Sequence, residues 1–379
     1  MTDKLGPPKV NELEVTVFGG VGGYGESCLV HIGNNKWVII DSCVGEAKAP
    51  SALAKLNDYG VEPAEAVVLV VVTHWHDDHI RGISEVVRNC PGAGVVLSSA
   101  LTEFEFLRYL ARFGEQRDIQ GGSRVSEFNA VFDIIQKNKE QGSKVPKRAI
   151  ADRCLENFSG LASSASGQGR IVALSPADFQ VERFLRYVAS DMPVQQETRR
   201  AAPAVSENDA AIAIWVDVGD VAVLLGSDLV EHGSCSSGWS AVLASKGRPH
   251  GVASLFKVPH HGASSAHHEH VWEKMLTPNC LSLLTPFARG AASRKLPSSE
   301  DIARINSLTN EAYVTSEPLF RKWAPADSMV RRSVREAGVK LSSCQNSGGY
   351  LTARSGPPSA RKWTLHKGET AVALAERST

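Results

Sequence analysis

The heptapeptide THWHDDH, residues 73–79, brings three histidines and two aspartates together directly after an apolar run. The run itself, AVVLVVV at residues 66–72, has the length of a strand that is buried on both faces. Imidazole and carboxylate groups are ligands that zinc, manganese and iron accept in proteins. The stretch therefore predicts metal-binding chemistry at the end of a buried strand.

Composition sets few limits on function. The chain has 379 residues, enough for one large domain or two ordinary ones, with 41 basic and 41 acidic side chains. This balance predicts neither attraction to nucleic acid nor repulsion from it, and it leaves room for a local basic patch. Seven cysteines without a C-x-x-C pair favour a reducing compartment. Because neither a secretory leader nor an apolar run of membrane-spanning length is evident, we expect a soluble cytoplasmic protein with no membrane contact.

Residues that can bind metal follow four separate apolar strands. Asp41 follows WVII, the heptapeptide follows VVLVVV, Asp228 follows VAVLLGS, and His260 and His261 follow ASLFKVP. Strand ends at one edge of a sheet converge, so these groups can form one site although they are far apart in sequence. Taken singly, each aspartate is also compatible with a turn, and the two histidines with the surface.

Local spacing favours a site for two ions. Residues two apart in an extended segment point the same way, so His74 and His76 are expected to bind one ion together. Asp78 and His79 lie where the chain turns into a helix and are expected to face a second ion. Asp228 is then the candidate for a bridging carboxylate. Metal binding lowers the pKa of water from about 15.7 towards roughly 7, which provides a hydroxide nucleophile.

Other polar residues have secondary roles in this interpretation. Asp41 is expected to fix the H-x-H loop through hydrogen bonds rather than to bind metal. His267, His268 and His270 are expected at the surface or in a loop, with the alternative that one of them reaches the site.

The motif H-W-H-D-D-H, with Asp41 before it and Asp228 and the His260-His261 pair after it, resembles the metallo-β-lactamase superfamily of hydrolases. The resemblance covers roughly residues 10–300, apart from an insertion. It implies an α/β fold, the four-layer αββα sandwich, with the metals at one edge between its two sheets.

The chain is expected to add two segments to that fold. Residues 101–160 combine helical spacing with many charges, which predicts a helical insertion in the β-rich core. SSEDIARINSL at 298–308 predicts a helix with serine at its cap. We therefore expect a catalytic domain over 10–310 and a C-terminal extension over 311–379 that packs on the same domain.

Within the superfamily, three segments look most like the branch found in the nuclease domain of bacterial DNA-uptake competence proteins, whose features phosphorylcholine esterases share. The segments are SENDAAIAI, VAVLLGSD and KVPHHGAS, which contain Glu207-Asn208, Asp228 and Lys257 to Ser264. The stretch GYGES at 23–27, followed by WVIIDSC, also resembles stand-alone bacterial members, some of which lie among antiviral defence genes.

The chain departs from the superfamily pattern at one ligand. Most members place a further histidine between the motif and the bridging aspartate, but this sequence has none between His79 and His232. The first ion would then have only His74, His76 and Asp228 from the protein, and water, Asn208 or substrate would complete its shell. We therefore expect one or two divalent transition-metal ions, zinc or manganese, with one bound more weakly.

The function that this pattern predicts is metal-dependent hydrolysis of a phosphodiester, most simply by a nuclease acting on DNA or RNA. Paired divalent ions stabilise charge at phosphorus and position an in-line hydroxide. Asp78 is expected to orient the hydroxide, and His261 to bind metal. His260 is expected to contact the phosphate or to protonate the leaving oxygen, although the sequence does not settle which of the two histidines has which role.

Nearby cations suit a polyanionic substrate. They are Arg81, Arg289, Arg294 and Lys295, and an ordinary solvated position explains each of them equally well. Two alternatives to a nuclease stay open. One is a hydrolase of a small ester, thioester or phosphocholine-like substrate, which an apolar pocket without a basic groove would favour. The other is a catalytically weak partner subunit of a bacterial complex, with antiviral defence as one setting. The helical insertion suits a lid or a partner-binding element, and a purely structural cap is an equal alternative.

Overall fold

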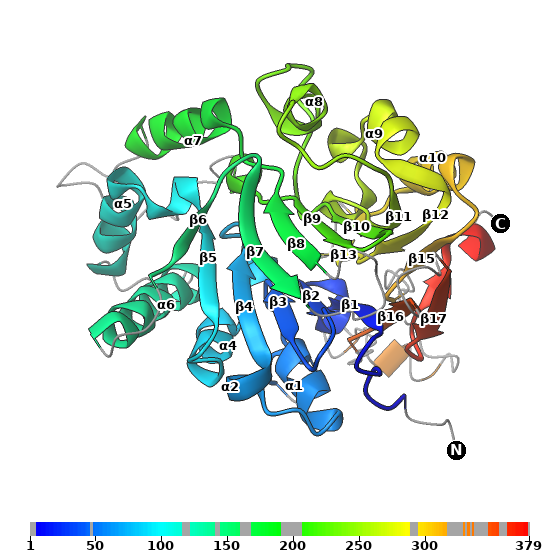
Figure 1. Cartoon of the computed structure of the whole chain (residues 1–379), viewed down its shortest axis with the longest axis horizontal. Coiled ribbons are helices and arrows are strands. Elements are labelled where there is room, and N and C mark those ends of the chain that lie inside the picture. The colour runs from blue at the N-terminus through cyan, green and yellow to red at the C-terminus, as the bar shows by residue number, and fades with distance from the viewer. Residues whose placement is uncertain are drawn as a thin grey trace.

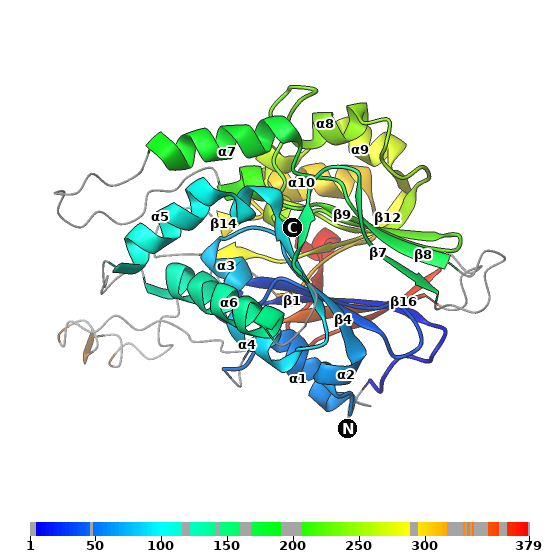
Figure 2. The same ribbon diagram turned by 60° about the vertical axis from the view of Figure 1, so that its left-hand side comes forward.

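Two β-sheets lie face to face in the computed structural model, with helices on both outer sides (Figure 1, Figure 2). This α–β–β–α order confirms the predicted four-layer sandwich. The structure describes residues 5–45, 48–115, 122–140, 145–159, 168–190, 207–288, 295–316, 329, 332–333, 336, 348–355 and 362–377.

The first sheet has the strand order β17-β16-β1-β2-β3-β4-β5-β6. Neighbours from β17 to β3 are antiparallel, whereas β3, β4, β5 and β6 run parallel to one another. The strand bounds are β1 Leu13–Gly19, β2 Glu26–His31, β3 Trp37–Ile40, β4 Val67–Val72, β5 Gly94–Ser98, β6 Lys147–Ala149, β16 Tyr350–Ser355 and β17 Trp363–Lys367.

The second sheet has the order β18-β15-β12-β11-β10-β9-β8-β7. Here β10, β11, β12 and β15 are parallel, and the other neighbours are antiparallel. The bounds are β7 Arg153–Ser159, β8 Gln168–Ala173, β9 Ile214–Val218, β10 Val221–Leu225, β11 Ala253–Lys257, β12 Leu276–Leu284, β15 Ala312–Val314 and β18 Val372–Ala373. A separate ribbon pairs β13 Phe287–Ala288 with β14 Lys295–Leu296.

Helices cover the outer face of each sheet. Those of the first sheet lie below it in Figure 2, and those of the second lie above it. The bounds are α1 Ser51–Asp58, α2 Pro63–Ala66, α3 Asp77–Ile80, α4 Ile83–Asn89, α5 Phe104–Glu115, α6 Gly122–Glu140, α7 Asp178–Ser190, α8 Gly238–Ala244, α9 Glu269–Lys274 and α10 Ser299–Leu308. Short 3₁₀ turns occur at η1 Val21–Gly23, η2 Ser99–Thr102, η3 Glu207–Ala210, η4 His260–Gly262, η5 Ser264–Ala266 and η6 Leu374–Arg377.

The central strand β4 explains why its sequence is apolar throughout. Leu69 and Val71 pack in the core between the sheets, whereas Val70 and Val72 pack against the helices outside. All four side chains are at most 1 % exposed. Because successive side chains point to opposite faces, a strand that is buried on both faces needs an apolar residue at every position.

The helical insertion is shorter than predicted. Helices α5 and α6 occupy 104–140, but residues 147–149 and 153–159 form β6 and β7 instead. The prediction of a helical stretch over 101–160 was therefore wrong at its C-terminal end. The reason is pairing, because β6 continues the first sheet beside β5 and β7 continues the second beside β8.

An aromatic cluster joins the inserted helices to the heptapeptide. Trp75 has its ring centroid 5.1 Å from Phe106 and 5.7 Å from Tyr109 on α5. Phe106 in turn contacts Phe128 on α6 and Phe184 on α7, at 5.9 and 5.7 Å. The residue between His74 and His76 is thus buried among three helices.

The C-terminal part of the chain adds strands to both sheets. Strands β16 and β17 extend the first sheet beyond β1, and β15 and β18 extend the second beyond β12. The domain boundaries proposed at 310 and 311 stay a prediction. Helix α10 begins with the expected serine cap, because Ser298 accepts a hydrogen bond from Asp301 N and Asp301 accepts one from Ser298 N. Within the described residues, none of the helices combines the length and apolar character that a bilayer crossing requires.

One buried histidine makes the stability of the fold depend on pH. His31 at the end of β2 is 1 % exposed, its Nδ1 lies 2.8 Å from Glu12 O, and its ring packs on Trp37. Burial lowers its pKa to about 4. The unfolded chain therefore takes up this proton first, and stability is lost as pH falls from about 6.5 to about 4.

We expect metal-free wild type to lose about 3 kcal/mol of unfolding free energy through His31 across that pH range. The variant His31→Gln should lose correspondingly less, as measured by urea denaturation at each pH. The exposed His250→Gln is the control and should follow the wild type. Equal pH dependence in His31→Gln and wild type would contradict the assignment.

Candidate metal centre

The site lies where parallel strands of both sheets end. Asp41 follows β3 and the heptapeptide follows β4, two parallel neighbours of the first sheet. Asp228 follows β10 and His261 follows β11, two parallel neighbours of the second sheet. The carboxyl ends of parallel strands meet at one edge, so the predicted residues come together between the sheets.

A first group of ligand atoms comes from His74, His76 and Asp228. His74 Nε2 lies 3.0 Å from His76 Nδ1 and 3.8 Å from Asp228 Oδ2. His76 Nδ1 lies 4.0 Å from the same carboxylate oxygen. All three atoms are within 4.8 Å of one another, which is close enough to share one ion.

A second group forms on the other side of the same carboxylate. His79 Nε2 lies 3.4 Å from Asp228 Oδ1 and 3.9 Å from Asp78 Oδ2. His261 Nε2 lies 3.3 Å from Asp78 Oδ2. The two oxygens of Asp228 therefore face different groups, which is the geometry of a bridging carboxylate.

Buried polar atoms show that this second group fits a cation. His79 Nε2, Asp228 Oδ1 and His261 Nε2 are buried and make no hydrogen bond of normal geometry within the described part of the chain. A buried polar atom left unsatisfied costs about 1–3 kcal/mol. A divalent ion would use all three as ligands, and Asp78 offers a fourth. The donor set of nitrogen and carboxylate oxygen suits zinc or manganese.

Asp41 fixes the loop that carries the histidines. Its Oδ1 accepts a hydrogen bond from Thr73 N at 2.8 Å, and its Oδ2 accepts one from Thr73 Oγ1 at 2.6 Å. The same Oδ2 lies 2.8 Å from His79 Nδ1. This contact holds the His79 proton on Nδ1, so that Nε2 faces the centre.

The geometry distinguishes the two adjacent histidines. His261 is 1 % exposed and points into the second ligand group, whereas His260 is part-exposed and lines the adjoining pocket. His260 Nδ1 lies 3.3 Å from Ser265 Oγ, and its Nε2 lies 3.5 Å from Asn208 Nδ2. Asn208 thus accompanies His260.

The backbone at this point is strained. His260 and His261 have φ values of 48° and 55°, in a region that side-chain-bearing residues rarely adopt. Gly262 follows with φ 83°, and a Cβ there would lie 2.8 Å from Leu284 Cδ2. This glycine is therefore required where the chain crosses the end of the second sheet.

Burial and charge set the protonation of the ligands. Burial lowers the pKa of His76 to about 4 and that of His74 well below its usual value, which keeps both imidazoles neutral. Burial acts against ionisation of Asp228, but the nearby histidines, His79 first, outweigh it and hold its pKa well below the ordinary range. Neutral imidazoles and an ionised carboxylate are the forms that bind metal.

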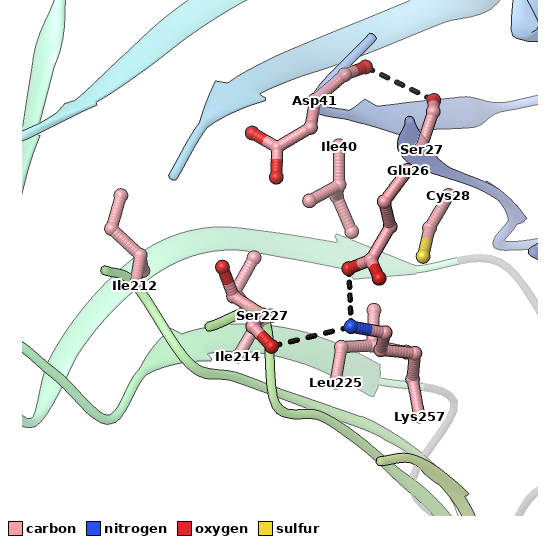
Figure 3. A pocket seen from close by; sticks show the side chains of 10 residues that line it. All are labelled: Glu26, Ser27, Cys28, Ile40, Asp41, Ile212, Ile214, Leu225, Ser227 and Lys257. Carbon is pink, nitrogen blue, oxygen red and sulfur yellow. Dashed lines mark hydrogen bonds and ion pairs between the residues drawn. The ribbon is translucent and has the colours of Figure 1, made fainter. Parts of the chain in front are cut away.

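Three residues that sequence reasoning did not select also meet at the centre. Glu26 is 2 % exposed at the start of β2, forms an ion pair with the buried Lys257, and accepts a hydrogen bond from Thr285 Oγ1 at 2.5 Å. This pair, Asp41 and Ser227 all line a cavity of about 10 Å³ (Figure 3). The usable signal was a glutamate at the start of the strand ESCLVH, every residue of which is buried.

The predicted substrate cations differ in position. Arg81 donates to Asp77 Oδ2 from Nε at 2.9 Å and from Nη2 at 2.5 Å, and its guanidinium lies 4.8 Å from the Tyr24 ring centroid. The Arg81 guanidinium is thus engaged in an ion pair with Asp77 of the same chain segment. Lys295 lines a pocket of about 630 Å³ that opens beside the centre. Arg289 and Arg294 lie outside the described residues.

The remaining histidines stand apart from the centre. His267 and His268 lie between η5 and α9, and His270 lies in α9. None of the three is in a ligand group among the described residues. His232 Nε2 lies 3.2 Å from Asp209 Oδ1 and 2.8 Å from Arg183 Nη2. Among the described residues, no further histidine, cysteine or carboxylate joins the group of His74, His76 and Asp228.

The sequence of residues 21–134, which contains the heptapeptide, matches the family model of the metallo-beta-lactamase superfamily. This segment belongs to that superfamily. The match confirms the resemblance inferred from the motif, whereas the branch stays a prediction. The metallo-beta-lactamase fold and the histidine–carboxylate groups together describe a metal-dependent hydrolase.

No curated protein sequence matches the chain. Among solved structures, the metallo-beta-lactamase fold protein YhfI from Bacillus subtilis is 13% identical, with a TM-score of 0.38, and the match covers 80% of this chain and 95% of that one. A diphosphatase of the PhnP family is 10% identical, with a TM-score of 0.37 and coverage of 91% and 98%. We draw no functional conclusion from likenesses this distant.

The two ligand groups should bind metal unequally. The group around Asp78, His79 and His261 has four protein ligands with the shared Asp228, whereas the group around His74 and His76 has three. Fewer protein ligands leave more exchangeable water, so the ion at His74 and His76 should leave first during chelation. Elemental analysis and anomalous diffraction at each stage measure the order.

Two variants give the controls for that experiment. His76→Ala should retain one equivalent of metal per chain, and Asp228→Ala should lose most of both. The reverse order of loss, or full metal content in Asp228→Ala, would mean that another residue completes the first group.

Proposed function

We propose that the protein is a metal-dependent phosphodiesterase. The observation that carries the proposal is the position of Asp228, whose two oxygens face two ligand groups beside a pocket of about 630 Å³. Paired sites of this kind suit hydrolysis at phosphorus, because ions bound there would supply a hydroxide at neutral pH and offset the developing charge.

Two residues of the chain are proposed to act on the reacting groups. Asp78 lies between the second ligand group and the pocket, and neighbouring histidines hold its pKa below the usual range despite its burial. It therefore stays ionised and is able to orient a nucleophilic oxygen. His260 lines the pocket from the segment that follows β11. One of its ring nitrogens is able to donate a hydrogen bond to a phosphoryl or leaving oxygen.

The pocket supports a nucleotide as the recognised unit. Its volume lies within the range of small-molecule sites and is too small for a duplex. Lys295, Ser264 and Ser265 line it together with the aromatic residues Tyr24 and Phe287. Cation, hydroxyl and aromatic groups together suit a phosphate joined to a base. In the nuclease version of the proposal, the substrate is single-stranded DNA or RNA.

A second candidate is a hydrolase of a small ester, thioester or phosphocholine-like compound. The apolar lining favours it, because Phe287 and Leu296 lie beside His261 and Lys295. The third candidate, a weak subunit of a larger complex, gains no support from the ligand groups, since a relic site has no reason to keep buried polar atoms unsatisfied.

Activity on phosphodiesters tests the leading proposal. Protein with its full metal content should hydrolyse bis(p-nitrophenyl) phosphate and linear single-stranded DNA or RNA, most strongly with manganese. His260→Gln should lower kcat by about 100-fold, because it removes a group that interacts with the moving proton, and should leave metal content unchanged.

The matched control for this variant is His270→Gln, which changes an exposed histidine on α9 and should keep wild-type activity. Hydrolysis of carboxylic esters or thioesters without any hydrolysis of phosphodiesters would replace the proposal by the second candidate.

A further inference from the structure

We propose that Lys257, Glu26 and Thr285 form a buried relay that positions His261 for metal binding. We call these four residues the Glu26 relay. They come from β2, β11 and the segments that follow β11 and β12, and each is at most 2 % exposed. Thr285 Oγ1 lies 2.5 Å from Glu26 Oε2 and 3.0 Å from His261 Nδ1. The inference concerns metal binding and does not depend on the identity of the substrate.

The direction of each hydrogen bond follows from the chemistry of the groups. An ionised carboxylate only accepts hydrogen bonds, so Glu26 must receive the single hydroxyl proton of Thr285. The Thr285 oxygen then has only lone pairs left for His261, which must carry its proton on Nδ1. The relay therefore leaves Nε2, the atom that faces Asp78 at 3.3 Å, available as a ligand.

Lys257 fixes the carboxylate end of the relay. Its ammonium pairs with Glu26 Oε1, and this pair is enclosed between the sheets (Figure 3). The same ammonium donates to Ser227 O at 3.2 Å, next to Asp228 in sequence. One buried cation thus ties the carboxylate of the relay to the loop of the bridging ligand.

The first ligand group contains a similar arrangement. Thr73 Oγ1 donates to Asp41 Oδ2 at 2.6 Å and lies 2.9 Å from His74 Nδ1. A carboxylate from the first sheet therefore fixes a buried histidine through a threonine hydroxyl twice in the same centre, once for His74 after β4 and once for His261 after β11. The repetition on unrelated segments supports a positioning role for Thr285 rather than an accident of packing.

The test compares two substitutions at Thr285. Thr285→Val keeps the shape of the side chain and removes its hydroxyl, whereas Thr285→Ser keeps the hydroxyl. Stepwise titration of the metal-free protein with zinc, against a chromophoric chelator, measures the affinity of each equivalent. His261→Ala should abolish the binding of one zinc equivalent. Thr285→Val should weaken the affinity for that same equivalent by about 10–100-fold, and Thr285→Ser should keep it within about 3-fold of wild type.

Spectroscopy and a matched control separate positioning from simple packing. The visible spectrum of the cobalt(II) protein should change in Thr285→Val and return in Thr285→Ser. Thr352→Val removes another fully buried hydroxyl, which is 2.9 Å from Thr16 Oγ1, and should change neither the spectrum nor the affinity. Unchanged affinity and spectrum in Thr285→Val, or equal losses in the Val and Ser variants, would overturn the proposal.

A second substitution keeps the proposal testable if Thr285→Val does not fold. Glu26→Gln preserves the size of the side chain but removes the charge that orients the Thr285 hydroxyl. It should weaken the same metal equivalent by about 10-fold or more. Wild-type affinity in folded Glu26→Gln would overturn the relay.

Discussion

Charge balance at the meeting point of the two sheets is the constraint on which the centre depends. Glu26, Asp41, Asp78 and Asp228 are each at most 4 % exposed, whereas Lys257 is the only lysine or arginine that is buried among the described residues. Burying unpaired charge is costly, so further positive charge must enter. Although burial opposes it, the carboxylates raise the pKa of His79 and His261, which therefore hold protons when no cation is bound. Metal binding must then displace protons, and affinity should weaken as pH falls.

The convergence of the ligands on one centre requires strained backbone conformations. Asp41, Ser227, His260 and His261 all have φ between 45° and 58°, and all four follow strands that are buried within the sandwich. Each such residue costs about 1–3 kcal/mol and persists only where the surrounding structure determines it. The strands supply that support, because their side chains pack in the core and their backbones are paired on both sides. Rigid strands thus hold the strained turns that aim the ligands.

Sequence predicted what depends on local pattern. The apolar run of β4, the H-x-H spacing and the serine cap of α10 are local signals, and the structure contains each of them. The relay was not predictable, because Glu26 and Thr285 are 259 positions apart and meet only when the sheets stack. Whether His260 or His261 turns inward depends on the positive φ angles of both residues, which their residue type does not predict. The insertion was overestimated because β6 has only three residues and pairs with β5, which lies before the inserted helices in the sequence, while β7 pairs with β8, beyond the segment predicted as helical.

The ligand group of His74 and His76 is affected by two features. It lacks the additional histidine, and Trp75, which lies between its two histidines in sequence, is buried. With only three protein ligands, the group of His74 and His76 would leave coordination positions of a bound ion open, and the side chain of His76 is 29 % exposed beside the pocket. Open positions are what a catalytic ion requires, but they leave the ligands less constrained. Trp75 offsets this, since its ring packs into the aromatic cluster of α5, α6 and α7 and so anchors the backbone between the two histidines. The inserted helices therefore stabilise the ligand loop that the missing histidine leaves weakest, which gives them a structural role before any partner is considered.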